Sequence, residues 1–387
     1  MKGSMRGGEG TIESPYFYNE KLSHEHAAVH KLLTLENDFQ RVQLSSRHGL
    51  LESIFDKLDN TNLQITQSFY EYTTLRSGAY LFRPEGQAML INADTVPIIR
   101  ICHGHIVDHA DIIVGDFRVQ IHIVKSHKPS LRRRVVVQSS VVVRSNREIV
   151  LRFNTDVASA GIFDTNNGME FQRRHRKDRG VIAPNFYPSV AGARLVDNKD
   201  WRRLTVTSSH TTAVTSLNDG VLEFMVHRSL AQDDGRGLAQ PVNDQSRAII
   251  SMHLQFEATK SARESEAHFR RVAIELDTPL QLLYGDCRVN DASTKLTVNS
   301  WKRVFVDAPY VLLQPAFSPD LHLLTLAVKS TNTDEVVMRL QNLLNRSTRS
   351  DGRVVLELDK IFDEDDAIRV SDMRETTLSA VYGKTIE

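Results

Sequence analysis

The sequence predicts an all-β protein, with a large β-sandwich, one connecting helix and a smaller C-terminal β-sandwich. Short segments that alternate apolar and polar residues recur from about residue 33 and are separated by polar turns. The segments 132–145 and 147–157 are rich in β-branched residues, as strands buried between two sheets are. A third observation concerns residues 259–279, where apolar residues follow helical spacing instead.

The first sandwich begins with strand-like segments that are closely spaced along the chain. "SRHGLLESIFDK" predicts a hairpin, with Gly49 at the turn. Residues 1–14 are rich in glycine and are expected to be disordered. The strands expected in the first sandwich are 35–45, 49–57, 63–74, 132–145, 147–157, 201–210 and 220–230.

A helix is expected at about 260–277, because apolar residues such as Ala267, Phe269 and Val272 follow roughly helical spacing and Pro279 ends the pattern. Strand-like segments then return. We therefore expect a supersandwich over 33–297 that includes this helix, and a small C-terminal β-sandwich over 298–387. The strands expected after the helix are 303–314, 321–330, 335–345 and 352–362.

The composition is that of a folded, water-soluble protein. The chain has 387 residues, 41% of them hydrophobic and 25% charged. Lys plus Arg and Asp plus Glu number 48 each, so no net positive field favours nucleic acid. The sequence has no apolar run of about 18 residues, so no membrane span is expected. Its first residues lack the apolar core of a signal peptide.

The stretch "ICHGHIVDHADI" at 101–112 holds three histidines, two aspartates and a cysteine. Metallo-β-lactamase-type hydrolases bind two metals with His-x-His-x-Asp-His, but here one more residue separates His105 from Asp108. In a strand, one extra residue turns every later side chain to the other face. The sequence therefore favours a strand that runs into a polar loop. A metallohydrolase centred on His103 and His105, weak metal-ligand candidates, remains an alternative.

Two other polar patterns each have two interpretations. The basic run at 173–179 is typical of a solvated strand and loop, or of a polyanion contact. The turns "FDTNNGMEF" and "LAQDDGRGL" combine Asp or Asn with Gly, which is ordinary turn chemistry. The same carboxylates and amides could bind sugar hydroxyls. We found no Gly-x-Ser-x-Gly elbow, phosphate-binding glycine loop or Cys-x-x-Cys pair.

Many segments in order resemble the C-terminal half of class II α-mannosidases, glycoside hydrolase family 38. The resemblance covers roughly residues 33–380, is closest at 203–238, and is most like the lysosomal branch. The other segments that carry it include "SGAYLFRP", "REIVLRFNTD", "NNGMEFQRRHRKDR", "APNFYPSVAGARLVD" and "EVVMRLQNL".

The resemblance implies a galactose-mutarotase-like supersandwich and a zinc-dependent retaining glycosidase acting on α-linked mannose. Such an enzyme uses two carboxyl groups about 5–5.5 Å apart. In the family these groups and the zinc ligands lie in an N-terminal barrel, so we expect no catalytic residue and no bound zinc in this chain. The implied partners are mannose-containing glycans and a barrel chain. The implied localisation is lysosomal or secretory, and the family's last strand is expected to be missing.

The function implied is that of an α-mannosidase-like protein represented by its C-terminal β region and inactive without the barrel. The alternative is a non-catalytic carbohydrate-binding or structural module. In the family, one β-region turn brings a Tyr to the substrate; here "FDTNNG" is one residue shorter and lacks that Tyr. The candidate substrate-rim residues are Asp164, Asn166, Asn167, Asp233, Asp234 and Arg236.

Overall fold

The chain forms two compact units, residues 1–278 and 279–387. Predictions for residues 1–14, 303–314 and 352–362 lie outside the described residues. The computed structural model describes residues 16–18, 32–91, 94–125, 133–177, 180–197, 199–259, 261–282, 320–329, 335–343, 372–379 and 383–385.

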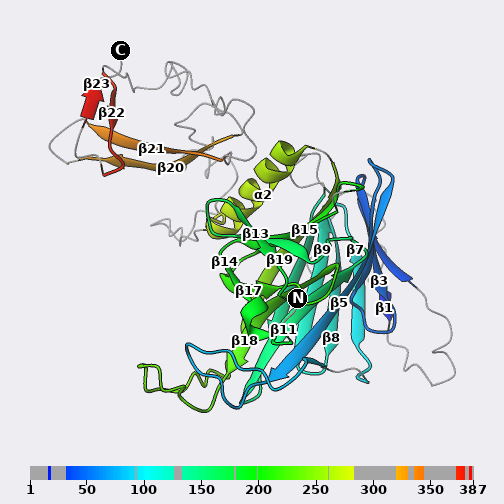
Figure 1. The fold of residues 1–387 in the computed structure, drawn as a ribbon. Helices are drawn as coiled ribbons and strands as arrows, with labels where there is room; N and C mark the ends of the chain where they lie inside the picture. The colour runs from blue at the N-terminus through cyan, green and yellow to red at the C-terminus, as the bar shows by residue number, and fades with distance from the viewer. Residues whose placement is uncertain are drawn as a thin grey trace, which may run out of the picture. The chain divides into compact units, whose positions relative to one another are not determined.

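Two large antiparallel sheets make up the first unit and pack face to face (Figure 1). Among the described residues, one sheet has ten strands and the other nine. The ten-stranded sheet runs β1 (Tyr16–Tyr18), β7 (Ile98–His103), β8 (Val107–Val114), β9 (Phe117–Val124), β10 (Val135–Val141), β19 (Ala248–Ala258), β16 (Arg202–Ser208), β15 (Gly192–Val196), β12 (Ile162–Asn166) and β13 (Phe171–His175).

The nine-stranded sheet combines strands from the beginning and the later part of the first unit, so its assembly depends on pairing between distant parts of the sequence. A 3-10 turn, η1 (Ala183–Asn185), precedes its edge strand β14. This sheet runs β14 (Tyr187–Ser189), β17 (Thr212–Thr215), β18 (Val221–Ser229), β11 (Arg147–Thr155), β5 (Thr61–Thr73), β4 (Leu51–Asp56), β3 (Gln40–Ser45) and β2 (Leu32–Glu36), and β6 (Met89–Leu90) pairs with β5.

Alternation along the strands places the core between the sheets. On β9, every second residue from Phe117 to Ile123 is buried, and the residues between face outward. Phe117 meets Phe69 of the opposite sheet edge-on, with ring centroids 5.0 Å apart. The predicted hairpin between β3 and β4 is confirmed, and Gly49 adopts a φ of +73° at its turn.

The predicted helix is confirmed as α2 (Ala262–Asp277). It begins where the Ser261 hydroxyl accepts a hydrogen bond from the Glu264 amide at 3.3 Å. Phe269 and Val272 are buried, and the helix contacts β16 on the outer side of the ten-stranded sheet. The all-β class with one connecting helix is therefore correct.

The second unit contains two short antiparallel pairs in its described part. β20 (Leu321–Val328) pairs with β21 (Val336–Asn342), and β22 (Arg374–Thr376) pairs with β23 (Gly383–Thr385). The predicted strands at 321–330 and 335–345 match the first pair. A complete small sandwich and the boundary at 297–298 stay predictions. No helix among the described residues is long and apolar enough to cross a membrane.

Candidate functional site

The histidine-rich stretch forms the β7–β8 hairpin, and a buried carboxylate organises its turn. Asp108, 2% exposed, accepts hydrogen bonds from the amides of Glu36 and Gly104 at 3.2 and 3.1 Å. Lys125 Nζ lies 2.7 Å from Asp108 Oδ1, and His103 Nδ1 lies 3.1 Å from Asp108 Oδ2. Burial acts to raise the Asp108 pKa, but the hydrogen bonds from Lys125 and His103 outweigh it and the pKa is lowered.

This hairpin does not fit a zinc site. Asp108 already serves four donors, and His105 is exposed beside the turn. Across the described ranges, no group of three or more His, Cys, Asp or Glu side chains could hold a metal ion. The stretch begins as a strand that runs into a polar turn, as predicted, but residues 107–112 return as part of a second strand, β8.

The β12–β13 hairpin carries three of the predicted rim residues, Asp164 and Asn166 on β12 and Asn167 in the turn. Asp164 is 4% exposed and receives Arg194 Nε at 2.8 Å on its Oδ2 atom. Asn166 is fully buried and accepts the amide of Gly168 at 2.8 Å. Asn167 is exposed, but its Oδ1 atom caps two amides of the following turn. Two of the three side chains are therefore buried.

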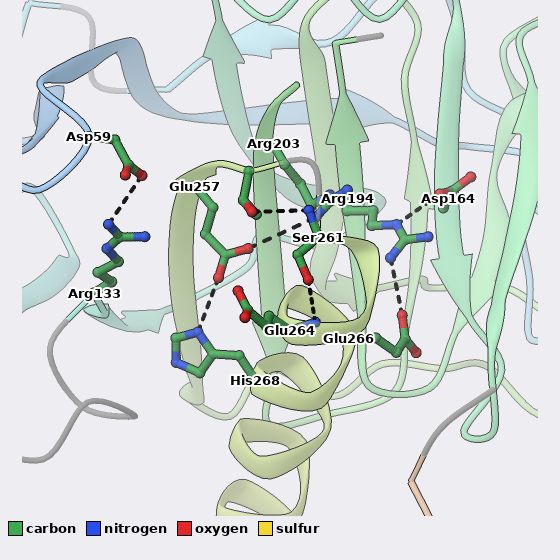
Figure 2. A network of polar contacts seen from close by, with 11 residues as sticks. Asp59, Arg133, Asp164, Arg194, Arg203, Glu257, Ser261, Glu264, Glu266 and His268 are labelled. Atoms are coloured by element: carbon green, nitrogen blue, oxygen red, sulfur yellow. Dashed lines mark hydrogen bonds and ion pairs between the residues drawn. The ribbon is translucent and has the colours of Figure 1, made fainter. Parts of the chain in front are cut away.

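A polar network joins this hairpin to α2 (Figure 2). Arg194 bridges two buried carboxylates, because its Nη1 atom also donates to Glu266 Oε2 at 3.1 Å. Arg270 donates to the carbonyl of Gly168 at 2.9 Å, at the tip of the hairpin. Nearby, His268 Nδ1 lies 3.2 Å from Glu257 Oε1. These contacts give the buried polar groups a structural role in fixing α2 to the sheet.

The remaining rim residues lie in the loop after β18. Asp234 Oδ2 accepts the amides of Tyr80 and Leu81 at 2.8 and 2.9 Å, which ties this loop to "SGAYLF". Asp233 accepts the amide of Gly235 at 2.9 Å, and Arg236 is exposed. Figure 1 shows this loop at the opposite end of the sandwich from α2. The six candidates thus form two separate groups, and their rim role stays a prediction.

The described part of the basic run, residues 173–177, lies on and after β13, and arginines in it have partners within the protein. Arg173 Nε lies 3.6 Å from Asp164 Oδ1, although the arginine is 64% exposed. Arg174 donates to Thr165 Oγ1 at 3.1 Å and stacks over Tyr187. A strand with solvated and paired charges is therefore the better description.

The sequence reasoning missed a cluster on the outer face of the nine-stranded sheet. Glu223, 0% exposed, receives Arg152 Nε at 2.7 Å and the Tyr72 hydroxyl at 2.6 Å. Burial lowers the Arg152 pKa, but Glu223 outweighs it and the pKa is raised. Burial, followed by the charge of Glu223, raises the pKa of Tyr72. The sequence signal that could have revealed this cluster is the presence of a Glu and an Arg within two largely apolar strands.

In the described part of the chain, cavities open on the outer faces of both sheets, and two of them concern polar clusters. The larger, about 530 Å³, lies over β7–β10 and β19 and is flanked by exposed isoleucines such as Ile98 and Ile249. Its polar groups engage one another, since Gln120 donates to Asp111 at 2.6 Å. The smaller, about 250 Å³, lies beside Arg152 and is lined mostly by polar side chains.

Comparison with known families identifies the family of this chain. The model of the glycosyl hydrolases family 38 C-terminal domain matches residues 35–236, a span of 202 of the 387 residues. This chain belongs to glycoside hydrolase family 38. The resemblance carried by the sequence segments is thereby confirmed.

Curated relatives in family 38 are α-mannosidases. The lysosomal α-mannosidase of Dictyostelium discoideum is 26% identical over 385 residues, which cover 94% of this chain and 36% of that protein. Human α-mannosidase 2 is 32% identical over 220 residues, covering 55% of this chain and 19% of that protein. The chain therefore spans about a third or less of the length of these relatives.

Solved structures of family 38 share the fold. An α-mannosidase from Enterococcus faecalis superposes with a TM-score of 0.51 at 12% identity, covering 62% of this chain and 31% of that chain. A second family 38 protein from Enterococcus faecalis gives a TM-score of 0.52 at 13% identity, covering 71% and 34%. At this identity the likeness concerns the fold alone.

Proposed function

We propose that this chain is the β-sandwich part of an α-mannosidase that removes terminal α-linked mannose from glycans. The observation that carries the proposal is the alignment of 94% of the chain with 36% of the Dictyostelium lysosomal α-mannosidase. The nucleophile, the acid and the zinc are assigned to an N-terminal barrel, on the same precursor or on a companion chain. Lysosomal or secretory localisation belongs to the same proposal.

The residues of this chain support a scaffolding part in that reaction. The hairpin with His103 and Asp108 does not fit zinc, because the aspartate is already bound by four donors. Retaining hydrolysis also needs two carboxyl groups held on either side of the scissile bond. The buried carboxylates of Asp164 and Glu266 are instead held by Arg194. The proposal therefore gives this chain no catalytic residue.

The predicted substrate-rim residues belong to two separate loops, and each loop has an exposed candidate. Asn167 is the exposed member of the β12–β13 turn, and Arg236 is an exposed member of the loop after β18. Because the two loops lie at opposite ends of the sandwich, only one of them can border a single glycan site (Figure 1). We assign that place to Asn167, whose turn Arg270 fixes against α2.

The test is an α-mannosidase assay with a nitrophenyl α-mannoside. The purified chain alone, with added zinc, is expected to give no turnover above buffer. A chimera in which this chain replaces the aligned region of the Dictyostelium enzyme is expected to turn over the substrate. Zinc-dependent turnover by the chain alone would refute the assignment of the chemistry to a barrel.

A non-catalytic carbohydrate-binding module remains the second candidate. One observation favours it: the cavity of about 250 Å³ beside Arg152 is lined by hydroxyl, amide and carboxylate groups. These groups suit sugar hydroxyls, which both donate and accept hydrogen bonds. Glycan binding without turnover is the result that this candidate predicts.

A further inference from the structure

The smaller cavity lies on the solvent side of the nine-stranded sheet, where two neighbouring strands present polar side chains in register. Ser68 of β5 is directly opposite Arg152 of β11, and Thr66 is opposite Asn154. Opposite residues of antiparallel strands have Cβ atoms about 4.5–5.5 Å apart, so these four side chains form one contiguous surface. Asn218, in the turn before β18, adds a wall to it.

Arg152 is held rigidly at the floor of this cavity. Its Nε and Nη2 atoms lie 2.7 and 2.6 Å from Glu223 Oε2. Its guanidinium also stacks over the Tyr70 ring, 3.7 Å from the ring centroid. The Tyr72 hydroxyl donates to the other carboxylate oxygen, Glu223 Oε1, at 2.6 Å. A ligand would therefore meet a fixed guanidinium, without the entropy cost of ordering a long side chain.

Asp219 supplies a second fixed charge at the rim. Its Oδ1 atom accepts the Ser159 hydroxyl at 2.8 Å and the Gly161 amide at 3.2 Å. These hydrogen bonds outweigh desolvation and lower the pKa of Asp219, so the group is ionised at neutral pH. The position of this carboxylate is set by the turn and needs no ligand to hold it.

The charge balance decides the class of ligand. Arg152 is already neutralised by Glu223, and Asp219 adds one negative charge. The uncompensated carboxylate of Asp219 disfavours an anion, and a cation would meet the guanidinium of Arg152 in the same lining. A neutral ligand rich in hydroxyl groups avoids both penalties and can use both charges as hydrogen-bonding partners.

Other lining groups are available to such a ligand. In the described part of the chain, the side chains of Thr66, Ser68, Asn154 and Asn218 line the cavity without making hydrogen bonds. They offer two hydroxyls and two amides, each able to donate and accept. A volume of 250 Å³ is about eight times the ~30 Å³ share of one water molecule, enough for a single sugar ring.

We propose that the cavity between Ser68, Arg152, Asn154 and Asn218 binds one neutral hexose unit of a glycan. Arg152 and Asp219 flank the ring and select vicinal hydroxyls, while the amides fix its orientation. The dissociation constant for a free methyl hexoside is on the order of 1 mM, because a ligand of this size makes few contacts. The inference rests on the second candidate function and deepens it by naming the site and the class of ligand, and binding here requires no hydrolysis.

The experiment is saturation-transfer NMR and calorimetry on the full chain, with methyl α-mannoside, methyl α-glucoside and methyl β-galactoside as probes and sulfate as the anionic probe. We expect at least one hexoside to bind, and sulfate to leave its binding unchanged. The Asn154→Ala/Asn218→Ala double variant should weaken binding about tenfold or more. Asn62→Ala is the matched control, because Asn62 is exposed on β5 and does not line the cavity.

Three results would overturn the proposal. The first is no hexoside binding at about 50 mM, which is 50-fold the expected dissociation constant. The others are unchanged binding in the double variant and displacement of the hexoside by sulfate. Should the double variant melt at a lower temperature than the parent, Ser68→Ala is tested by the same criteria. Because the readout is binding, a negative result leaves the mannosidase proposal standing. Turnover by the chain alone would leave the hexose-binding proposal standing.

Discussion

Replacement of Arg194 by Met should destabilise the first unit, because it removes the cation between two buried carboxylates. Asp164 is 4% exposed and Glu266 is 0% exposed. Breaking a buried ion pair by removing one partner costs about 3–5 kcal/mol. Each carboxylate keeps a longer contact, Asp164 to Arg173 at 3.6 Å and Glu266 to Arg270 at 3.5 Å. We therefore expect the lower end, about 3 kcal/mol.

The assay is thermal unfolding followed by circular dichroism. For a unit of this size, about 3 kcal/mol corresponds to a melting temperature lower by roughly 6–12 °C. Arg173→Met is the matched control, since it contacts the same Asp164 but is 64% exposed, and should cost less than about 1 kcal/mol. Equal shifts for the two variants, or no shift for Arg194→Met, would refute the view that this network fixes α2 to the sheet.

Three further predictions follow. Gly220→Ala should cost more than Gly235→Ala: both have a φ of +70°, worth about 1–2 kcal/mol, but only at Gly220 would a Cβ collide with the Thr155 carbonyl. Denaturant titrations of the two variants check this. Burial, with Arg134 beside it, lowers the pKa of His253 to about 3. At a pH below the usual pKa of histidine, this side chain is protonated in the unfolded chain but stays neutral in the folded chain. The free energy of unfolding should therefore fall by up to about 1.4 kcal/mol per pH unit between about pH 6.5 and 3. His253→Gln should flatten that fall, and an unchanged slope would contradict it. Untagged protein should contain far less than one zinc per chain, and stoichiometric zinc by elemental analysis would restore the histidine hairpin as a metal site.

Much of the fold could be predicted from the sequence because local signals and tertiary packing agree. Alternation of apolar and polar residues predicted the strands, and helical spacing that ends at Pro279 predicted the helix that the structure shows at Ala262–Asp277. The pairing order of the sheets was out of reach. β10 lies between β9 and β19, whose sequences are more than a hundred residues apart, and no local signal encodes that choice.

The candidate sites were harder to predict, because turn chemistry and sugar-binding chemistry use the same residues. Asn167 binds backbone amides of its own turn, and Asp234 binds the amides of Tyr80 and Leu81 in a neighbouring loop. The cavity beside Arg152 depends on register: Ser68 and Arg152 are far apart in sequence but directly opposite in the sheet. The family resemblance indicated which chemistry to consider, and the strand register showed which side chains meet.

The measurement that tests the account most directly is hydrolysis of a nitrophenyl α-mannoside by the purified chain, with and without zinc. A full-length α-mannosidase serves as the positive control, and a chelator separates zinc-dependent turnover from background. The account predicts no turnover by this chain in either condition, because its buried carboxylates are bound by arginines and its histidine hairpin does not fit zinc. Zinc-dependent release of nitrophenol by the chain alone would contradict it.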